Sequence, residues 1–248
     1  MLTRVHHVGL VVRRLEDGLA FWQDALGLQV SKQATVADQG VKAALLPIGR
    51  SEIELLEPID PGGGVAKFLE KRGEGLHHVC FETPDVAGEL ARARGEGFPL
   101  IDEVPRAGLA GTICFLHPRG TRGVLVEFAT PPPGETHHAT AGRGPLAGLA
   151  LAEVTARSRE PAGAATLFVH KLGLEPGGTD AVTVGGVRLR FLADETGSEG
   201  LAGLVLDVGD PAAARAALAA YVLATDPEGF HLDPARCRGV PLRLQRGA

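Results

Sequence analysis

The sequence is poor in cysteine, in aromatic residues and in long apolar runs, and these shortages exclude several classes of protein. Its 248 residues include three cysteines and 4% aromatic residues. The cysteines lie far apart without a C-x-x-C spacing, so we expect reduced thiols and not disulfides. No apolar run is long enough to span a bilayer, and the N-terminus has no signal-peptide pattern. We therefore expect a cytoplasmic chain with no membrane partner.

An excess of positive charge is also missing. The formal net charge is −5 at pH 7, and no dense run of Lys or Arg occurs. Nucleic-acid interfaces need a basic patch, so we expect no nucleic-acid partner. Hydrophobic residues make up 44% of the chain. This content is enough to bury a core in one large domain or two domains of ordinary size.

Two histidine doublets, each at the head of a short apolar run, are the most distinctive feature that is present. His7 ends the first doublet and His78 ends the second. An apolar run with a glutamate follows each of them, carrying Glu54 after the first and Glu127 after the second. The equivalent residues are separated by 71 positions for the histidines and 73 for the glutamates. The chain therefore contains the same His…Glu unit twice, and we interpret these four residues as one site.

The alternation of apolar and turn residues predicts a β-α-β-β-β unit that occurs twice before residue 131. In the first unit we expect a strand over 3–12, a helix over 15–26, strands over 29–35, 41–47 and 52–56, and a short helix over 65–72. In the second unit we expect a strand over 76–82, a helix over 84–94, and strands over 99–104, 112–117 and 124–129.

The rest of the chain repeats this pattern in a weaker form. Residues 132–145 are rich in Pro, Gly, Thr and Ala and are predicted to be a linker, with a solvated histidine doublet at 137–138. Beyond it, segment 230–243 aligns with 114–127 without a gap. The predicted fold is therefore α+β, with paired βαβββ modules in two tandem domains, 1–131 and 146–248.

Two imidazoles and two carboxylates form a ligand set for one divalent metal ion, with positions left open for water or substrate. Mixed nitrogen and oxygen ligands suit Zn, Co, Ni, Mn or Fe, and the sequence does not choose among them. A lone histidine on an apolar strand is more often a core residue than a ligand. The repeated spacing and the cost of burying an unpaired carboxylate favour the metal site.

Neighbouring polar residues receive other interpretations. Alternation along a strand places His6 and His77 on the faces opposite the ligand histidines, so we interpret both as structural. Glu52 shares a face with Glu54 and is an alternative ligand. Cys80 shares a face with the second ligand histidine and is interpreted as a small core residue.

Several stretches carry a resemblance to a known family, among them His7-Val8-Gly9-Leu10, Glu52-Ile53-Glu54-Leu55-Leu56-Glu57-Pro58, Val65-Ala66-Lys67-Phe68-Leu69, Gly75-Leu76-His77-His78, Phe115-Leu116-His117-Pro118 and Gly123-Val124-Leu125-Val126-Glu127. On these motifs residues 5–131 resemble the vicinal-oxygen-chelate (glyoxalase-like) superfamily, and within it the methylmalonyl-CoA epimerases. The resemblance places the metal ligands of the family on His7, Glu54, His78 and Glu127. At Ala43 this chain lacks an acid that some members carry, and Arg119 stands where the family usually has Lys.

The resemblance implies a reaction on an acyl-CoA substrate, namely inversion at C2 of methylmalonyl-CoA through an enolate. A divalent metal would stabilise the charge of the enolate as a Lewis acid. Epimerisation needs an acid and a base on opposite faces of the enolate. The family analogy makes Glu127 the first candidate for the base, and Glu54 is the weaker candidate for the second group.

The second copy has lost this ligand set. In the alignment Glu54 falls on Arg190, His78 on Gly203 and Glu127 on Arg243. We expect no metal in residues 146–248, and the two arginines are candidates for an anion pocket. The second copy is also a candidate replacement for the partner subunit of a homodimer, which would make the chain an internal pseudo-dimer.

Three other functions stay open at this point. Two-domain non-haem iron dioxygenases of the superfamily have a similar architecture but use two histidines and one glutamate, usually in the C-terminal domain. Lactoylglutathione lyase shares the four-ligand set, but its motifs fit less well. Small-molecule-binding resistance proteins usually lack the ligands. The intact N-terminal set favours an isomerase.

Overall fold

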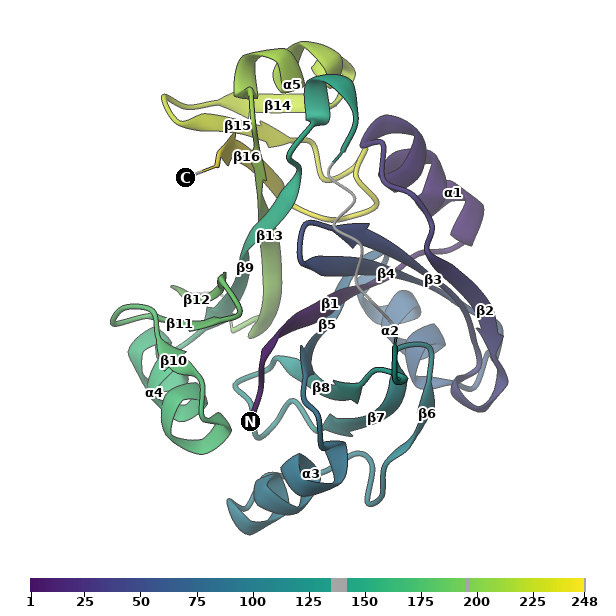
Figure 1. The fold of residues 1–248 in the computed structure, drawn as a ribbon, viewed down its shortest axis with the longest axis vertical. Coiled ribbons are helices and arrows are strands. Elements are labelled where there is room, and N and C mark those ends of the chain that lie inside the picture. Colours follow the sequence, from purple (N-terminus) through teal and green to yellow (C-terminus); the bar gives the residue numbers. More distant parts are fainter. Residues whose placement is uncertain (135–141, 195–196, 248) are drawn as a thin grey trace. The chain divides into compact units, whose positions relative to one another are not determined.

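The computed structural model describes residues 1–134, 142–194 and 197–247, which form two eight-stranded mixed sheets (Figure 1). The strand order is β2-β3-β4-β1-β5-β8-β7-β6 in the first sheet and β10-β11-β12-β9-β13-β16-β15-β14 in the second. The two sheets have the same strand order, because each strand of the first sheet corresponds to the strand numbered eight higher in the second. The repeat inferred from the sequence is therefore a repeat of topology, and the α+β fold of paired βαβββ modules is confirmed.

The first half of the chain contains both predicted modules. Its elements are β1 (Arg4–Val11), α1 (Leu15–Leu19), β2 (Lys32–Val36), β3 (Val41–Ile48), β4 (Ser51–Pro58), α2 (Gly64–Arg72), β5 (Gly75–Glu82), α3 (Val86–Gly95), β6 (Arg106–Gly108), β7 (Gly111–Leu116) and β8 (Leu125–Thr130). After α1 the helix continues as a π-helical segment over Ala20–Ala25 and buries Phe21 and Trp22. The side chain of Asp85 caps α3 by accepting a hydrogen bond from the backbone N–H of Gly88.

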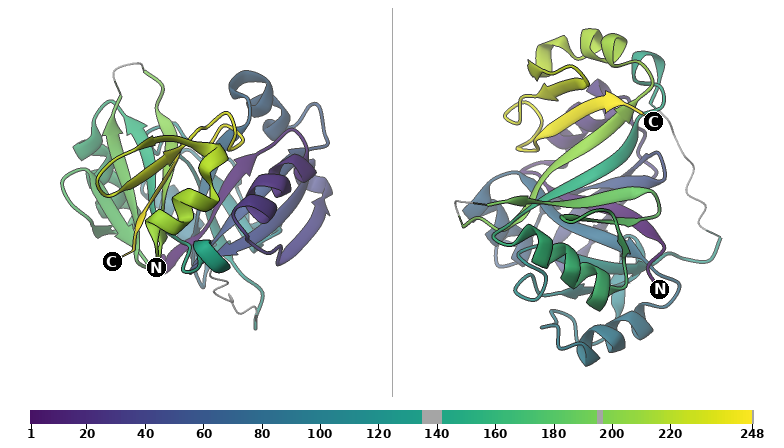
Figure 2. Two further views of the ribbon diagram at one scale, coloured as in Figure 1. Left: turned by 90° about the horizontal axis from the view of Figure 1, so that it is seen from above. Right: turned by 90° about the vertical axis from the view of Figure 1, so that its left-hand side faces the viewer.

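The second half has the same order of elements. They are β9 (Ala150–Ser158), α4 (Pro161–Leu172), β10 (Glu175–Pro176), β11 (Ala181–Val184), β12 (Val187–Ala193), β13 (Gly200–Val208), α5 (Pro211–Ala217), β14 (Val222–Thr225), β15 (Gly229–Leu232) and β16 (Leu242–Arg246). Helix α4 packs on β11 and β12 (Figure 2). The expected linker lies partly in residues 135–141, outside the described residues, and so does the histidine doublet at 137–138.

One predicted strand is wrong. Residues 99–104 form no strand, and only Leu100 makes an isolated bridge, with Leu116. The carboxylate of Asp102 accepts a hydrogen bond from the backbone N–H of Phe115 at 2.8 Å and pairs with Arg106 at 2.8 Å. Backbone hydrogen bonds from Ile101 to Phe115 and from His117 to Pro99 also hold the segment beside β7, but they form no regular ladder. The strand begins only at Arg106.

The chain forms two compact units, and each unit combines segments from both halves. The first consists of Met1–His7, His78–Thr136 and Glu153–Ala202, and the second of Val8–His77, His137–Ala152 and Gly203–Ala248, as far as these segments are described. Each unit thus contains most of one βαβββ module from each sheet. The division into domains 1–131 and 146–248 follows the two sheets and stays a prediction.

In the first unit, the C-terminal ends of α3 and α4 bind each other. Arg92 of α3 donates hydrogen bonds to the carbonyl oxygens of Lys171 and Leu172 of α4. Lys171 in turn donates to the carbonyl of Glu96 just after α3, at 2.9 Å. Cations stabilise helix C-termini because the last carbonyls lack intrahelical partners. These reciprocal contacts join a helix of the first half to a helix of the second half.

Replacing Arg92 by Ala is expected to lower the free energy of unfolding by about 1–3 kcal/mol, because the carbonyls of Lys171 and Leu172 lose a donor. The buried carboxylate of Glu89 also loses one of its two cationic partners and keeps the N-terminal amino group. Denaturant unfolding followed by circular dichroism measures this change. Arg94→Ala is the matched control on the same helix, since its ion pair with Glu103 is largely exposed and should contribute less than about 1 kcal/mol. Equal effects of the two substitutions would contradict the role given to Arg92.

The second unit also joins elements of both halves. The Phe21 ring lies 5.3 Å from the Tyr221 ring, centroid to centroid. Gly239 has φ +76°, and a Cβ atom there would overlap the carbonyl oxygen of Glu74, so only glycine fits this approach.

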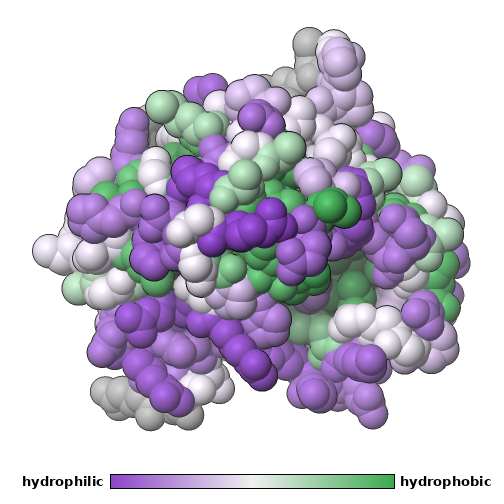
Figure 3. All heavy atoms as spheres, turned by 90° about the horizontal axis from the view of Figure 1, so that it is seen from below, coloured by the Kyte–Doolittle hydropathy of each residue, from purple (hydrophilic) through white to green (hydrophobic). Residues whose placement is uncertain are grey.

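Polar and apolar side chains are intermixed over the face drawn in Figure 3.

Candidate metal centre

Three buried polar side chains meet inside the first unit, each from a different strand. They are His7 of β1, His78 of β5 and Glu127 of β8, with at most 3% of each residue exposed. The sheet order places β1, β5 and β8 next to one another. Strands β5 and β8 are parallel, and Cys80 is the register partner of Glu127. The glutamate therefore enters the sheet two residues beyond the level of His78.

The contacts among these side chains form a closed triangle. His7 Nε2 lies 3.0 Å from His78 Nε2 and 3.1 Å from Glu127 Oε2. The third side, from His78 Nε2 to Glu127 Oε2, is 2.9 Å. Each Nε2 holds at most one proton, and a protonated Nε2 has no lone pair left to accept another. Hydrogen bonds can therefore satisfy at most two of the three contacts.

A metal ion bound between the three side chains would satisfy all three contacts, which protons alone cannot do. Two ligands at right angles around one cation, each about 2.1 Å from it, are about 3.0 Å apart. All three measured separations are close to this value. Two imidazoles and a carboxylate also match the donor types that divalent transition metals prefer. The three residues therefore fit a divalent cation that they bind from one side, which leaves its other coordination positions open.

Apolar side chains line one side of the triangle. The ring of His78 packs edge-on against Phe115, with centroids 5.3 Å apart. Phe115 belongs to a cluster of buried residues that also includes Cys80, Ala110, Ile113 and Ala129. Low polarity strengthens the interaction of a charge with the groups that face it. A cation and a developing anion would therefore interact more strongly here than in water.

Glu127 is held in its ionised form. Burial raises the pKa of this carboxyl group, but its charge interactions and hydrogen bonds with His7 and His78 outweigh burial and lower the pKa from 4.5 to about 2. The carboxylate is therefore ionised at neutral pH, which is the form that binds a cation.

This shift predicts a pH dependence of stability. A carboxyl group with a lowered folded-state pKa stabilises the fold above its unfolded pKa, and this contribution disappears as the pH falls through the folded value. In metal-free protein, the stability advantage of the wild type over Glu127→Gln should therefore shrink between about pH 4.5 and pH 2. Urea unfolding of both proteins across this range, in the presence of a chelator, measures the difference. A difference that stays constant would contradict the ion pairing.

The remaining predicted ligand, Glu54, lies on β4, which neighbours β1 in the sheet order. It is 6% exposed and lies in the second unit, whereas the three side chains of the triangle lie in the first. Glu52, the alternative ligand, also lies in the second unit and is buried as well, and its Oε1 accepts a hydrogen bond from Ser31 Oγ at 3.2 Å. Ligation by either glutamate of β4 stays a prediction.

Two residues interpreted as structural have different surroundings. The ring of His77 packs against Phe68, with centroids 4.9 Å apart. His6, in contrast, reaches the site, because its Nδ1 lies 2.8 Å from Nδ1 of His7. His6, His7 and Cys80 also have ligand atoms within 4.8 Å of one another. Strand alternation gave no sign of this contact, and the only signal in the sequence was the doublet itself.

The second half conserves the position of Glu127 but not its chemistry. In the second sheet, Arg243 of β16 is the register partner of Val205, which lies two residues after Gly203. In the first sheet, Glu127 is the register partner of Cys80, which lies two residues after His78. The alignment of these positions is therefore confirmed by the strand register. Arg243 pairs with Asp226 at 3.1 Å. Hydrogen bonding to Arg243 holds the pKa of the Asp226 carboxyl well below its usual range.

Arg190, the other arginine of the expected anion pocket, is also engaged by a carboxylate. Its Nε lies 3.1 Å from Asp180 Oδ2, and 45% of its side chain is exposed. Acidic partners reduce the attraction of both guanidinium groups for an anion, so the structure gives the anion-pocket hypothesis no support.

Comparisons with known proteins relate the first half of the chain to one superfamily. Residues 6–115 match the model of the glyoxalase/bleomycin resistance protein/dioxygenase superfamily. The uncharacterized protein YqjC of Bacillus subtilis is 38% identical over 138 residues, which are 55% of this chain and 98% of that protein. The ethylmalonyl-CoA/methylmalonyl-CoA epimerase of Cereibacter sphaeroides is 34% identical over 131 residues, 52% of this chain and 98% of that protein.

The chain belongs to the glyoxalase/bleomycin resistance protein/dioxygenase superfamily.

Within this superfamily the first half of the chain is of the epimerase type. A solved structure of a Streptomyces coelicolor methylmalonyl-CoA epimerase variant, in complex with 2-nitronate-propionyl-CoA, is 36% identical with a TM-score of 0.52. The match covers 53% of this chain and 99% of that protein. The part matched by the superfamily model contains His7, Glu54 and His78, whereas Glu127 lies beyond it. Among the described residues, no helix is long and apolar enough to cross a membrane.

Proposed function

We propose that this superfamily member is a metal-dependent epimerase that inverts the configuration at C2 of methylmalonyl-CoA. One observation carries the proposal: the buried triangle of His7, His78 and Glu127, in which at most two of three contacts can be hydrogen bonds. The epimerases among the relatives supply the substrate class, an acyl-CoA.

The chemistry of this substrate suits the site. The proton at C2 lies between a thioester and a carboxylate, and its removal places negative charge on the thioester oxygen. A divalent cation held by His7, His78, Glu127 and Glu54 would supply Lewis-acid stabilisation of that charge. Its identity among Zn, Co, Ni, Mn and Fe is left open. Both imidazoles present Nε2 to this point, and the burial of the residues limits competition by water.

Glu127 is proposed as the base that accepts the C2 proton. Its carboxylate is ionised, and its second oxygen lies outside the triangle that Oε2 forms with the imidazoles. A positioned base contributes on the order of 10²–10⁴ to the rate. Inversion also requires a group that returns a proton to the opposite face of the planar intermediate. Glu54 is proposed for this role, because it occupies the position equivalent to Glu127 in the other module.

The second half is proposed to act without a metal. We propose that residues 1–131 form the metal-binding domain, that 132–145 connect the domains, and that 146–248 form the degenerate domain. A cytoplasmic location accords with the three free cysteines. Either a homodimer or an internal pseudo-dimer accords with the exchange of modules between the halves.

Proton exchange at C2 tests the proposal. The full chain is loaded with one divalent metal at a time and incubated with methylmalonyl-CoA in D₂O, and NMR follows the C2–H signal. We expect loss of this signal together with interconversion of the two epimers, and no reaction after chelation. Parallel incubations contain the hemithioacetal of methylglyoxal and glutathione, or a catechol with Fe²⁺ and oxygen. Turnover of either, without exchange at C2, would replace the epimerase by a lyase or a dioxygenase.

A further inference from the structure

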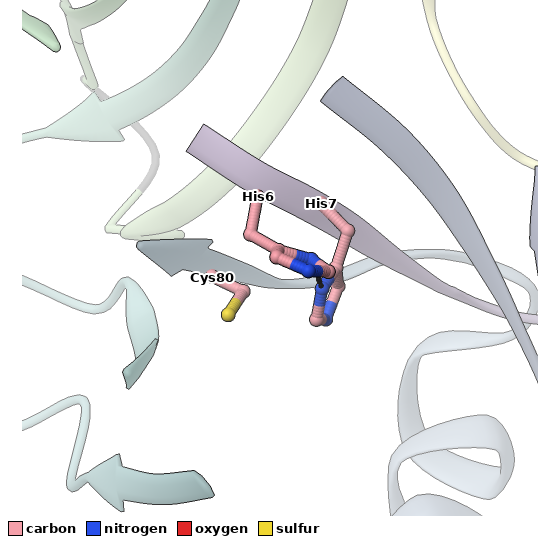
Figure 4. Close-up of side chains that lie close together, drawn as sticks. All are labelled: His6, His7 and Cys80. Atoms are coloured by element: carbon pink, nitrogen blue, oxygen red, sulfur yellow. Dashed lines mark hydrogen bonds between the residues drawn. The ribbon is translucent and has the colours of Figure 1, made fainter. Parts of the chain in front are cut away.

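His6 and His7 are consecutive residues of β1, and side chains at consecutive positions of a strand normally point to opposite faces. Their rings nevertheless meet. Nδ1 of His6 lies 2.8 Å from Nδ1 of His7, and the two rings pack edge to face with centroids 5.0 Å apart (Figure 4). Both residues are at most 1% exposed. The contact therefore lies in the buried interior, where an unmade hydrogen bond is costly.

The two nitrogens of His7 face different groups. Nε2 faces His78 and Glu127, at 3.0 and 3.1 Å, and Nδ1 faces His6. A neutral imidazole carries one proton, on one nitrogen or the other. Binding a metal through Nε2 requires the lone pair there, so the proton must be on Nδ1. A proton on Nδ1 of His7 points at Nδ1 of His6, which accepts it when His6 carries its own proton on Nε2.

The opposite arrangement conflicts with the site. If His6 donated from Nδ1, neutral His7 would have its proton on Nε2, between His78 and Glu127. That proton would occupy the nitrogen that the metal needs. Metal-binding histidines generally donate their other ring N–H to an acceptor that fixes the tautomer and the ring orientation. In this chain the neighbouring imidazole is an acceptor within reach, at 2.8 Å.

We propose that His6 is a positioning residue, which accepts the Nδ1 proton of His7 and thereby fixes the tautomer that presents Nε2 to the metal. This inference rests on the proposed function, because it concerns the same metal centre. It assigns a role to a residue whose place in a strand predicts a purely structural one.

Cys80 is the third member of the group drawn in Figure 4, with ligand atoms of all three residues within 4.8 Å. A separate metal held by His6, His7 and Cys80 is the alternative. The observed Nδ1–Nδ1 separation of 2.8 Å is that of a hydrogen bond. A metal ion between these two nitrogens would need the lone pair of each and would leave no proton between them. The Cys80→Ala titration described below distinguishes the two arrangements.

The hydrogen bond can be measured in the Zn²⁺-loaded, ¹⁵N-histidine-labelled full chain. NMR of this protein detects the proton on Nδ1 of His7 and the scalar coupling that crosses an N–H···N hydrogen bond to Nδ1 of His6. We expect this coupling in the wild type, and in His6→Leu we expect faster exchange of the His7 Nδ1 proton with water. A wild type that has the Nδ1 proton of His7 but no coupling to His6 would overturn the proposal.

Metal affinity provides the second readout, by titration of the full chain with Co²⁺ followed in the visible spectrum. His6→Leu should weaken binding about 10–100-fold, the usual effect of removing such a partner. His6→Asn should restore most of the affinity, because its side-chain oxygen can accept the same proton. Cys80→Ala should leave affinity and stoichiometry unchanged. Unaltered affinity in His6→Leu, or a second bound Co²⁺ that Cys80→Ala removes, would refute the role of His6.

These outcomes are distinguishable from failure of the proposed function. A wild-type chain that bound neither Co²⁺ nor Zn²⁺ would refute the metal centre itself. A chain that binds metal but shows no coupling between His6 and His7 would refute the role of His6 alone. Thermal unfolding of each variant shows whether it has folded, and His6→Asn retains a polar side chain of similar reach if His6→Leu does not fold.

Discussion

Replacing Glu127 by Gln is expected to reduce C2 proton exchange by about 10²–10⁴-fold, the usual contribution of a positioned base. Glutamine has nearly the same shape, but its neutral amide is a far weaker proton acceptor than a carboxylate. It also removes the negative charge that faces His7 and His78. Single-turnover exchange in D₂O, at saturating metal, separates the loss of the base from a loss of metal. Full retention of exchange would contradict the assignment.

Glu52→Gln is the matched control for this substitution. Glu52 is also buried, at 5% exposure, but it accepts a hydrogen bond from Ser31. We expect this variant to exchange C2 protons within a few-fold of the wild-type rate. A loss as large as that of Glu127→Gln would make Glu52 part of the site and would reopen the choice between the two glutamates of β4.

Replacing His78 by Ala is expected to weaken metal binding by more than about 100-fold, beyond the range for a residue that only supports a ligand. The substitution removes one corner of the triangle and leaves the charge of Glu127 opposite a single imidazole. Isothermal titration with Co²⁺ or Zn²⁺ measures the affinity. The expected result is a loss of affinity with retention of the folded structure in circular dichroism.

The adjacent histidine provides an internal control. His77 packs against Phe68 and has no place in the triangle. His77→Ala should therefore change metal affinity little, although it loses the ring contact. Similar losses of affinity in the two variants would mean that the substitutions act through folding, and the case for direct ligation by His78 would fail.

The sequence could place His7, His78 and Glu127 together because strand alternation and the internal repeat are visible in it. Alternation along β1 and β5 puts one histidine of each doublet on the same face, and the repeat supplies the matching glutamate. The hydrogen bond between His6 and His7 was not predictable in this way. It depends on the side-chain torsions of two consecutive residues, which strand periodicity does not describe.

Tertiary contacts account for the other differences. The expected strand over 99–104 is apolar enough, but the carboxylate of Asp102 binds the backbone of Phe115 and replaces the ladder. The association of a module from each half in one unit depends on contacts such as that of Arg92 with the end of α4. Such contacts join residues about 80 positions apart, and no pattern within either segment encodes the pairing.

Anomalous diffraction from crystals of the Co²⁺-loaded full chain tests the central claim most directly. A single strong peak should lie about 2.1 Å from Nε2 of His7, Nε2 of His78 and Oε2 of Glu127. An anomalous map with no peak at this place, or with cobalt bound only elsewhere on the chain, would contradict the metal centre and the epimerase that depends on it.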